Sequence, residues 1–101
     1  MSKFQEIINS DIPTLVDFYA DWCGPCKMQA PVIKELSKKF GDRAKIIKVD
    51  VDKNQNASLA YGIRSIPTLI LFKNGKIVWR HMGFSPLNDL SDVIEYHIAH
   101  N

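Results

Sequence analysis

This sequence contains few cysteines, no long apolar run and no block of charges of a single sign. Two cysteines among 101 residues cannot form the disulfide network that stabilises many small secreted domains. No apolar run approaches the roughly 20 residues of a transmembrane helix, and the formal net charge of +2 comes without a basic block or acidic tail. Because nothing indicates nucleic acid or membrane partners, we expect partners that are proteins recognised by shape.

The composition is that of an ordinary globular domain, with 46% hydrophobic and 24% charged residues. A chain of this length buries roughly 65% of its unfolded surface, which is enough to fold without disulfides or metals. We therefore expect one domain over residues 1–101, with both cysteines free for chemistry. The N-terminal residues turn polar at once and lack the pattern of a secretory signal. We expect a reducing cytoplasm, which favours a reductase over an oxidase.

Both cysteines lie in one short motif, Trp22-Cys23-Gly24-Pro25-Cys26. A structural disulfide here would enclose so short a loop that it would add only about 2 kcal/mol. A zinc site needs four ligands, and the chain has no second cysteine pair. His81, His97 and His100 offer nitrogens, but the last two fall in the predicted C-terminal helix. The spacing therefore favours redox chemistry, with a metal site or inert thiols as alternatives, and we expect no resident metal or cofactor.

Hydrophobic periodicity predicts four helices and four strands. The helices are expected at about 3–10, 23–40, 54–61 and from 86 through the C-terminal histidines, and the strands at about 14–20, 44–51, 68–72 and 77–79. Asn74-Gly75 is a strong hairpin signal, so the strands that flank it should be antiparallel. The alternation of strand and helix before them implies a parallel pair. The predicted fold class is therefore α/β, with a four-stranded mixed sheet covered by helices on both faces.

The same pattern assigns several side chains to the core or to helix ends. Met28 is expected to point inward from the long helix, and Phe72 and Trp79 are placed in the core. Asn54 and Ser85 are expected to cap the starts of the third and fourth helices. Each assignment follows from the register of the helix or strand beside the residue.

Three motifs together resemble the thioredoxin family: Trp22-Cys23-Gly24-Pro25-Cys26-Lys27, Val16-Asp17-Phe18 and Ile66-Pro67-Thr68. Lys73-Asn74-Gly75 and Gly83 agree with the same family, and the similarity runs over nearly the whole chain. The resemblance implies a thioredoxin-like three-layer sandwich.

The chain departs from the longer members of that family in two places. Those longer members begin with an extra strand that pairs beside the strand expected here at about 44–51. The pattern of this chain predicts no such strand. This edge should therefore be open, with Lys45, Lys48 and Asp50 either as charged guards against strand pairing or as ordinary solvated side chains. Tyr19 stands where many relatives carry tryptophan near the active site, which we expect to affect fluorescence and packing more than chemistry.

The cysteine pair suits thiol–disulfide exchange, in which the attacking species is a thiolate. A free cysteine, with a pKa of about 8.5, is mostly protonated at neutral pH, so something must stabilise the anion. Cys23 is predicted at the N-terminus of the long helix, where free N–H groups and the helix dipole favour negative charge. We expect Cys23 to be an exposed nucleophile that forms a mixed disulfide, and Cys26 to resolve it. The resemblance implies the same two roles.

The residues between the cysteines also fit this chemistry. Gly24 permits close approach of a partner backbone, and Pro25 suits the first turn of a helix. By resemblance, this dipeptide belongs to the reducing branch of the family.

Asp17 is a carboxyl group in an otherwise apolar predicted strand. Desolvation would raise its pKa into a range useful for proton transfer. The resemblance implies that Asp17 is the acid/base for Cys26 and that Lys48, on the neighbouring strand, lies near it and tunes it. The alternatives are a buried carboxyl with satisfied hydrogen bonds for Asp17 and a surface lysine for Lys48.

The resemblance also implies a substrate-binding surface around the thiols. It implies that the Ile66–Pro67 peptide bond is cis and that the Ile66 backbone binds an extended substrate segment. This mode of recognition has little side-chain selectivity. The expected surface consists of Trp22, Tyr61, Ile63, Ile66, Pro67 and Gly83. For Tyr61, an interpretation as a core or cap residue is the stronger one, whereas Trp22 is expected to be exposed.

Together these residues predict a dithiol–disulfide oxidoreductase that reduces protein disulfides. The resemblance implies recycling by thioredoxin reductase, which holds a flavin and uses NADPH, and clients such as ribonucleotide reductase, peroxiredoxin and methionine sulfoxide reductase. A monomer is expected. Two other functions stay open, namely a disulfide isomerase or oxidase, and a binding module without redox activity that serves as a subunit of another enzyme.

Overall fold

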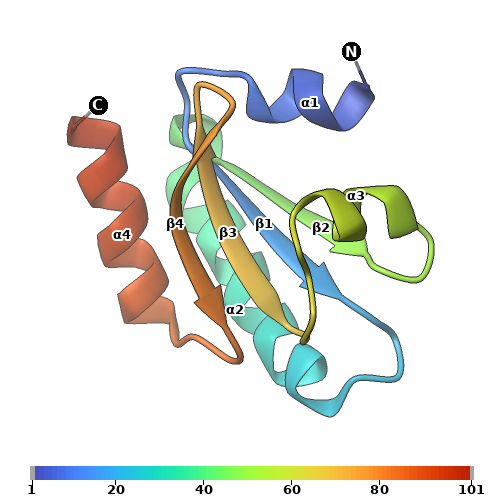
Figure 1. Ribbon diagram of the computed structural model, residues 1–101. Coiled ribbons are helices and arrows are strands. Elements are labelled where there is room, and N and C mark those ends of the chain that lie inside the picture. The colour runs from blue at the N-terminus through green and yellow to red at the C-terminus, as the bar shows by residue number, and fades with distance from the viewer. Residues whose placement is uncertain (1, 101) are drawn as a thin grey trace.

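The computed structural model describes residues 2–100, and its helices and strands follow the predicted order (Figure 1). The elements are α1 (Lys3–Ile8), β1 (Thr14–Tyr19), α2 (Gly24–Phe40), a short 3-10 helix (Gly41–Arg43), β2 (Lys45–Asp50), α3 (Gln55–Ala60), β3 (Thr68–Lys73), β4 (Lys76–Met82) and α4 (Leu87–Ala99). Every predicted helix and strand is present, with ends shifted by a few residues. No helix within residues 2–100 is long and apolar enough to cross a membrane.

The four strands form one mixed sheet in the order β2-β1-β3-β4. β1 and β2 are parallel, whereas β3 is antiparallel to both β1 and β4. The β3–β4 hairpin turns at Asn74 and Gly75, whose φ angles are 55° and 78°, the left-handed conformation that an Asn-Gly pair adopts readily. The predicted mixed α/β sheet is confirmed, and within the described residues β2 is an edge strand, as expected.

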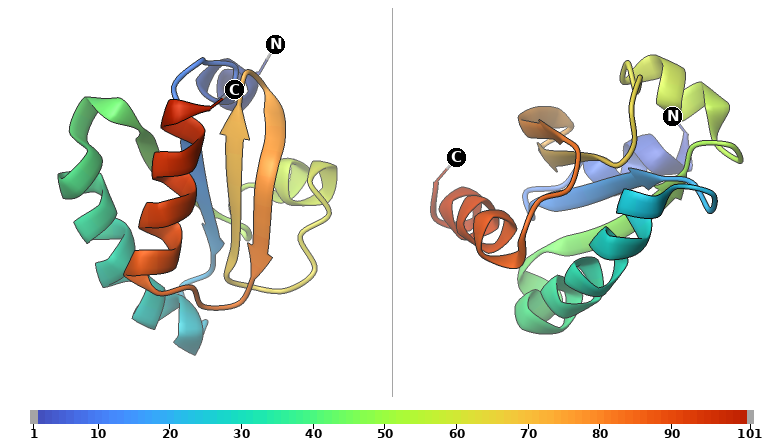
Figure 2. Two further views of the ribbon diagram at one scale, coloured as in Figure 1. Left: turned by 90° about the vertical axis from the view of Figure 1, so that its left-hand side faces the viewer. Right: turned by 90° about the horizontal axis from the view of Figure 1, so that it is seen from below.

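Helices cover both faces of the sheet, α2 and α4 on one face and α1 and α3 on the other (Figure 2). Strand β1 lies inside the sheet and is buried along most of its length, so its side chains alternate between two apolar layers. Leu15 belongs to the layer beneath α2 and α4, whereas Val16 and Phe18 belong to the layer beneath α1 and α3. The predicted sandwich of helices around the sheet is therefore confirmed.

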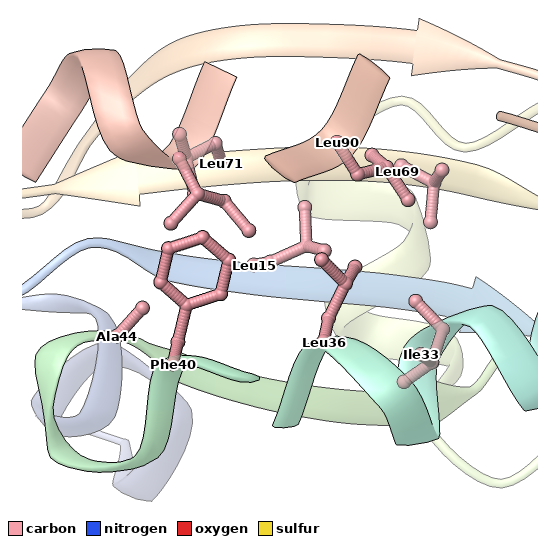
Figure 3. Close-up of a cluster of buried hydrophobic side chains, with 9 residues drawn as sticks. Leu15, Ile33, Leu36, Phe40, Ala44, Leu69, Leu71 and Leu90 are labelled. Atoms are coloured by element: carbon pink, nitrogen blue, oxygen red, sulfur yellow. The ribbon is translucent and has the colours of Figure 1, made fainter. Parts of the chain in front are cut away.

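Two apolar cores hold these layers together. The larger core, seen in Figure 3, consists of Leu15, Ile33, Leu36, Phe40, Ala44, Leu69, Leu71, Leu90 and Ile94. The core on the opposite face consists of Ile8, Val16, Phe18, Val49, Ile70 and Phe72. Full burial of one such large side chain contributes about 1.5–3 kcal/mol, so the larger core, which includes Ile33, Leu36 and Phe40 of α2, fixes that helix firmly against the sheet. Phe72 is buried as predicted, but Trp79 is only half-buried because β4 is an edge strand.

Two assignments at the start of α2 and α4 are wrong. Met28 is 64% exposed, and the buried position beside it belongs to Gln29, a residue whose polarity hid its place in the core. The side chain of Gln29 exchanges two hydrogen bonds, of 2.9 and 2.8 Å, with the backbone of Ser85. Because Ser85 is held there, α4 begins at Leu87, with Pro86 rather than Ser85 as its N-cap residue.

The turn after β2 also differs from the expectation. Asn54 precedes α3 but makes no side-chain capping bond; its amide donates instead to the carbonyl oxygen of Asp50 at 3.0 Å. Asp50 is buried, and its carboxylate accepts the backbone N–H of Asp52 at 2.9 Å. Asp50 therefore holds this turn and is not a guard on the open edge. Lys45 donates to the carbonyl oxygen of Ile7 at 3.3 Å, so its charge is directed toward α1.

Candidate functional site

The two cysteines lie at the first turn of α2, at the end of the sheet that is remote from both chain termini (Figure 1). They form a disulfide with their Cα atoms 5.3 Å apart. Cys23 is the N-cap residue, and its Sγ accepts the backbone N–H of Cys26 at 3.2 Å. Pro25 occupies the first turn, where its missing N–H costs nothing. The sulfur of Cys23 thus replaces the side-chain oxygen of an ordinary N-cap residue.

Cys23 is less exposed than predicted. Cys23 and Cys26 are each only 4% exposed, because Ala20 and the partly buried Tyr19 and Ile66 pack around them. Gly24 and Pro25, between the cysteines, are exposed, so the disulfide lies just beneath the surface. The expectation of an exposed sulfur in this oxidised state was wrong, since it ignored the loop that comes from the other side of the sheet.

That loop contains the Ile66–Pro67 peptide bond, which is cis. The carbonyl oxygen of Ile66 lies 3.7 Å from Cys23 Sγ. The carbonyl oxygen of Pro67 accepts the backbone N–H of Gly83 at 2.7 Å, and Gly83 has a φ of 92°, which favours glycine. Three segments that are distant in sequence therefore meet at this end of the sheet: the start of α2, the loop before β3 and the turn after β4.

Trp22 is 70% exposed beside the cysteine pair, as predicted. Its indole Nε1–H donates to the carboxylate of Asp52 at 2.9 Å, so the large ring has a defined orientation despite its exposure. Sequence reasoning did not identify Asp52. The signal that was available is the acidic pair Asp50 and Asp52 at the end of β2, where the chain enters a loop, a position that commonly carries functional side chains.

Two more exposed apolar residues flank Gly83 and were also missed. Met82 is 65% exposed and Phe84 is 39% exposed. Met82 pairs with Thr68 across the β3–β4 register, which places it next to the loop that contains Pro67. Together with Trp22, they give this end of the molecule an apolar surface, of the kind that binds other proteins.

Tyr61 and Ile63 are not part of the apolar cluster around the sulfurs. Both pack against the core beneath α1 and α3. The ring of Tyr61 lies 5.5 Å from that of Phe4 and 5.2 Å from that of Phe72, centroid to centroid. Of the residues in the loop between α3 and β3, it is Ile66 that contacts the thiol cluster.

Asp17 is almost completely buried, with 1% of its surface exposed. Neither carboxylate oxygen has a hydrogen-bond partner among the described residues. Burial raises the pKa of Asp17 from 3.8 to about 6, although the positive charge of Lys48 opposes this rise. Lys48 is directly opposite Asp17 in the β1–β2 register. With this pKa, the carboxyl group of Asp17 changes its protonation state mostly between about pH 5 and pH 7.

A small cleft of about 150 Å³ opens beside Cys26. Its lining includes Cys26, Tyr19 and Lys48, together with the charged residues Asp21 and Lys27. A larger open cleft of about 740 Å³ lies between α1 and α3, but it contains neither cysteine. Of these two clefts, the smaller one is therefore the one that reaches a cysteine, Cys26.

The described residues do not contain a group of three or more His, Cys, Asp or Glu side chains arranged to hold a metal ion. His97 and His100, the nitrogens considered above as zinc ligands, lie at the end of α4, whereas the cysteines begin α2. The metal alternative therefore has no preformed site within residues 2–100.

The fold and the cysteine pair together define a class of protein: an α/β sandwich that carries a dithiol–disulfide couple at the N-terminus of a helix. Residues 1–96 match the family model described as Thioredoxin. The chain is 51% identical over 92 residues to a thioredoxin from Haemophilus influenzae, covering 91% of this chain and 86% of that protein. It is 49% identical over 84 residues to a thioredoxin from Bacillus subtilis, covering 83% of this chain and 81% of that protein.

Solved structures agree with this similarity. The structure of a mutant thioredoxin from Halobacterium salinarum matches with a TM-score of 0.87 and 39% identity, covering 97% of this chain and 85% of that chain. A Malassezia sympodialis thioredoxin matches with a TM-score of 0.85 and 36% identity, covering 94% of this chain and 83% of that chain. The chain belongs to the thioredoxin family, whose members are disulfide oxidoreductases that act with a reductase and with disulfide-containing clients.

Proposed function

We propose that this protein reduces disulfide bonds in other proteins by passing two electrons per cycle through the Cys23–Cys26 pair. The observation that supports this most directly is the hydrogen bond from the backbone N–H of Cys26 to Cys23 Sγ at the first turn of α2. A reduced sulfur in this position is stabilised as an anion by the N–H group and by the helix dipole. The thiolate is the species that attacks disulfides.

The reaction runs in two steps of thiol–disulfide exchange. First, the Cys23 thiolate attacks one sulfur of a client disulfide, so that a Cys23–client disulfide forms and the other client sulfur leaves as a thiolate. Second, Cys26 loses its proton and attacks Cys23 Sγ, so that the Cys23–Cys26 disulfide forms and the second client thiolate leaves. The client gains two electrons and the cysteine pair loses two. The second step is effectively intramolecular because the two cysteines share one helical turn.

Asp17 acts as the acid/base for Cys26 in this scheme, through water in the adjacent cleft. The support is its burial, the absence of a hydrogen-bond partner for it within residues 2–100, and its pKa of about 6. A base with a pKa just below neutrality is mostly ionised at pH 7 and still accepts a proton readily. Lys48 tunes Asp17 by its positive charge.

Clients bind across the end of the sheet as extended segments. The backbone of Ile66, beside the cis Pro67 and 3.7 Å from Cys23 Sγ, offers main-chain hydrogen bonds that require little sequence selectivity. Trp22 and Gly83 border this surface, and Met82 and Phe84 extend it. We assign no contact with clients to Tyr61 or Ile63, since both pack into the core.

The chain offers a matched pair for testing this surface. Met82 and Met28 are exposed to nearly the same extent, 65% and 64%, but only Met82 pairs with the strand that follows Pro67. Met82→Ala should raise the KM for a protein disulfide about five-fold, because truncating one well-placed apolar contact weakens binding. Met28→Ala should leave KM nearly unchanged. Equal effects of the two substitutions would argue against the assigned surface.

The partners follow from the family and remain part of the proposal. Thioredoxin reductase, with its flavin and NADPH, would return Cys23 and Cys26 to the dithiol, so this chain itself uses no cofactor besides its own cysteine pair. Clients would include ribonucleotide reductase, peroxiredoxin and methionine sulfoxide reductase. A single cysteine pair suited to catalysis fits a reducing cytoplasm. We propose a single domain over residues 1–101 that acts as a monomer.

Reduction of insulin disulfides with NADPH and thioredoxin reductase tests the function. The wild-type protein should reduce insulin, and Cys23→Ser should abolish turnover because no mixed disulfide can form. Cys26→Ser should accumulate the mixed disulfide, visible as a covalent complex in a non-reducing gel. If insulin reduction persists in Cys23→Ser, or if Cys26→Ser traps nothing, the assigned roles are wrong. A reduction potential far less negative than that of reducing thioredoxins would instead indicate an oxidase or isomerase.

A further inference from the structure

Tyr19, Asp17 and Lys48 share one face of the sheet. Asp17 and Tyr19 are two residues apart on β1, so their side chains point to the same side. Lys48 on β2 is the direct partner of Asp17 in the parallel register. This is the face covered by α2, the helix that carries Cys26.

The ammonium group of Lys48 contacts the ring of Tyr19. Its Nζ lies 4.3 Å from the ring centroid, within the range of a cation–π interaction. The carboxylate of Asp17 has no hydrogen-bond partner within the described residues, and Lys48 therefore donates nothing to it. The Lys48 ammonium therefore contacts the Tyr19 ring, although Asp17 is its direct partner across the strand pair.

The ring and the cation both line the cleft of about 150 Å³ beside Cys26. Two further charged side chains, Asp21 and Lys27, line the same cleft. Tyr19 and Lys48 come from β1 and β2, whereas Lys27 comes from α2. The contact between Tyr19 and Lys48 therefore lies where solvent approaches Cys26, at the end of the strand that also contains the buried Asp17.

We propose that Tyr19 is a positioning residue, whose ring holds the Lys48 ammonium at the cleft and off the Asp17 carboxylate, so that Asp17 stays free to exchange a proton. The proposal rests on the proposed acid/base role of Asp17 for its consequence in the reaction. If the ammonium moved onto the carboxylate, the resulting ion pair would stabilise the ionised form. Asp17 would then be a weaker base for Cys26.

Titration of the Asp17 carboxyl carbon by NMR tests the contact without any measurement of activity. In the oxidised protein, Tyr19→Leu should lower the pKa of Asp17 by about one pH unit, because the released ammonium pairs with the carboxylate. Tyr19→Phe, which keeps the ring and removes only the hydroxyl, should retain the wild-type value. An unchanged or raised pKa in Tyr19→Leu would overturn the proposal. If Tyr19→Leu does not fold, Tyr19→Met provides the same test.

Loss of the Tyr19 ring would also admit water to Asp17. A double-variant comparison therefore distinguishes the effect of the Lys48 charge on the pKa of Asp17 from the effect of hydration. Lys48→Met should raise the pKa of Asp17, since Lys48 lowers it in the wild-type protein. In the Lys48→Met background, Tyr19→Leu should then have little further effect. If Tyr19→Leu lowers the pKa equally with and without Lys48, water is responsible and Tyr19 does not act through Lys48.

The kinetics of mixed-disulfide resolution connect this contact to the reaction. Tyr19→Leu should shift the pH midpoint of the resolution rate downward by the same amount as the NMR pKa, and Tyr19→Phe should not shift it. If Asp17→Asn leaves the rate and its pH profile unchanged, the acid/base role fails, although the NMR result for Tyr19 can still hold. If the NMR shift is absent while Asp17→Asn slows resolution, the positioning role alone fails.

Discussion

Two buried ionisable side chains of the same sheet have opposite surroundings. Lys73, at the end of β3, is 8% exposed, and its ammonium donates to the carbonyl oxygens of His97 and His100 at the end of α4. Asp17, in β1, is 1% exposed, and neither of its oxygens has a partner among the described residues. The Lys73 charge is engaged by two hydrogen bonds at a helix C-terminus, whereas the Asp17 carboxylate makes no hydrogen bond within the described residues and has only the charge of Lys48 to oppose the effect of burial.

The difference separates a structural charge from one that fits the proposed proton transfer. A cation at a helix C-terminus satisfies carbonyl groups that have no partner within the helix and complements the helix dipole. A buried carboxylate without partners destabilises the fold, and such groups concentrate at functional sites, where a shifted pKa is useful. Lys73 therefore joins α4 to the sheet by hydrogen bonds, whereas the burial that destabilises ionised Asp17 also gives it the raised pKa that the proposed proton transfer requires.

The largest expected effect is on the structural side of this comparison. Lys73→Met should lower the free energy of unfolding by about 2–3 kcal/mol, because two carbonyl oxygens at the end of α4 lose their donor. Lys76, its exposed partner across the hairpin, is the matched control, and Lys76→Met should change stability by less than about 0.5 kcal/mol. Urea denaturation at pH 7 measures both. Similar small effects for the two lysines would show that burial of Lys73 contributes nothing.

Replacing Asp17 is expected to change the free energy of unfolding in the opposite direction, so that the protein becomes more stable. Its pKa is raised to about 6 by burial, so the folded state binds a proton more tightly than the unfolded state. Stability should therefore fall as pH rises from about 4 to about 6, and the full penalty should remain at higher pH. Asp17→Asn removes the charge and should stabilise the protein by about 2 kcal/mol at pH 8.

The control for Asp17→Asn is the same measurement in acid. Near pH 4 the carboxyl group is protonated in the folded state and half protonated in the unfolded state, so most of the stabilisation should disappear. Urea denaturation at the two pH values gives the comparison. A gain of equal size at pH 4 and pH 8 would mean that the substitution acts through packing and that charge plays no part.

Local patterns in the sequence were sufficient for the fold and for the reactive sulfur. Apolar runs and the Asn74-Gly75 turn predicted the order of elements because hairpins and helix starts depend on neighbouring residues. The placement of Cys23 at the N-terminus of α2 followed in the same way. The raised pKa of Asp17 followed from its place in an apolar strand. The roles proposed for Pro67 and Asp17 came from resemblance to a family, since neither residue has a local pattern that reveals which residues it faces.

The missed features all depend on contacts between distant segments. The bond between Trp22 and Asp52 joins residues 30 positions apart, and hydrophobic periodicity contains no information on such a pair. The burial of Cys23 depends on the loop that carries Ile66, so sequence reasoning about α2 alone left the sulfur exposed. Gln29 was overlooked because a polar residue in a core position interrupts the apolar pattern that identifies the inward face.

The smallest expected effect tests whether Lys73 acts as a charge on its neighbours. Burial lowers the pKa of His97, and the positive charges of Lys73 and His100 lower it further. Because the unfolded state takes up this proton first, stability should decline as pH falls below about 6.5. In an NMR titration, Lys73→Met should raise the pKa of His97, whereas Lys76→Met should leave it unchanged. A His97 pKa that is identical in all three proteins would show that the buried ammonium exerts no field at the end of α4, and the contrast with Asp17 would then lie in hydrogen bonding alone.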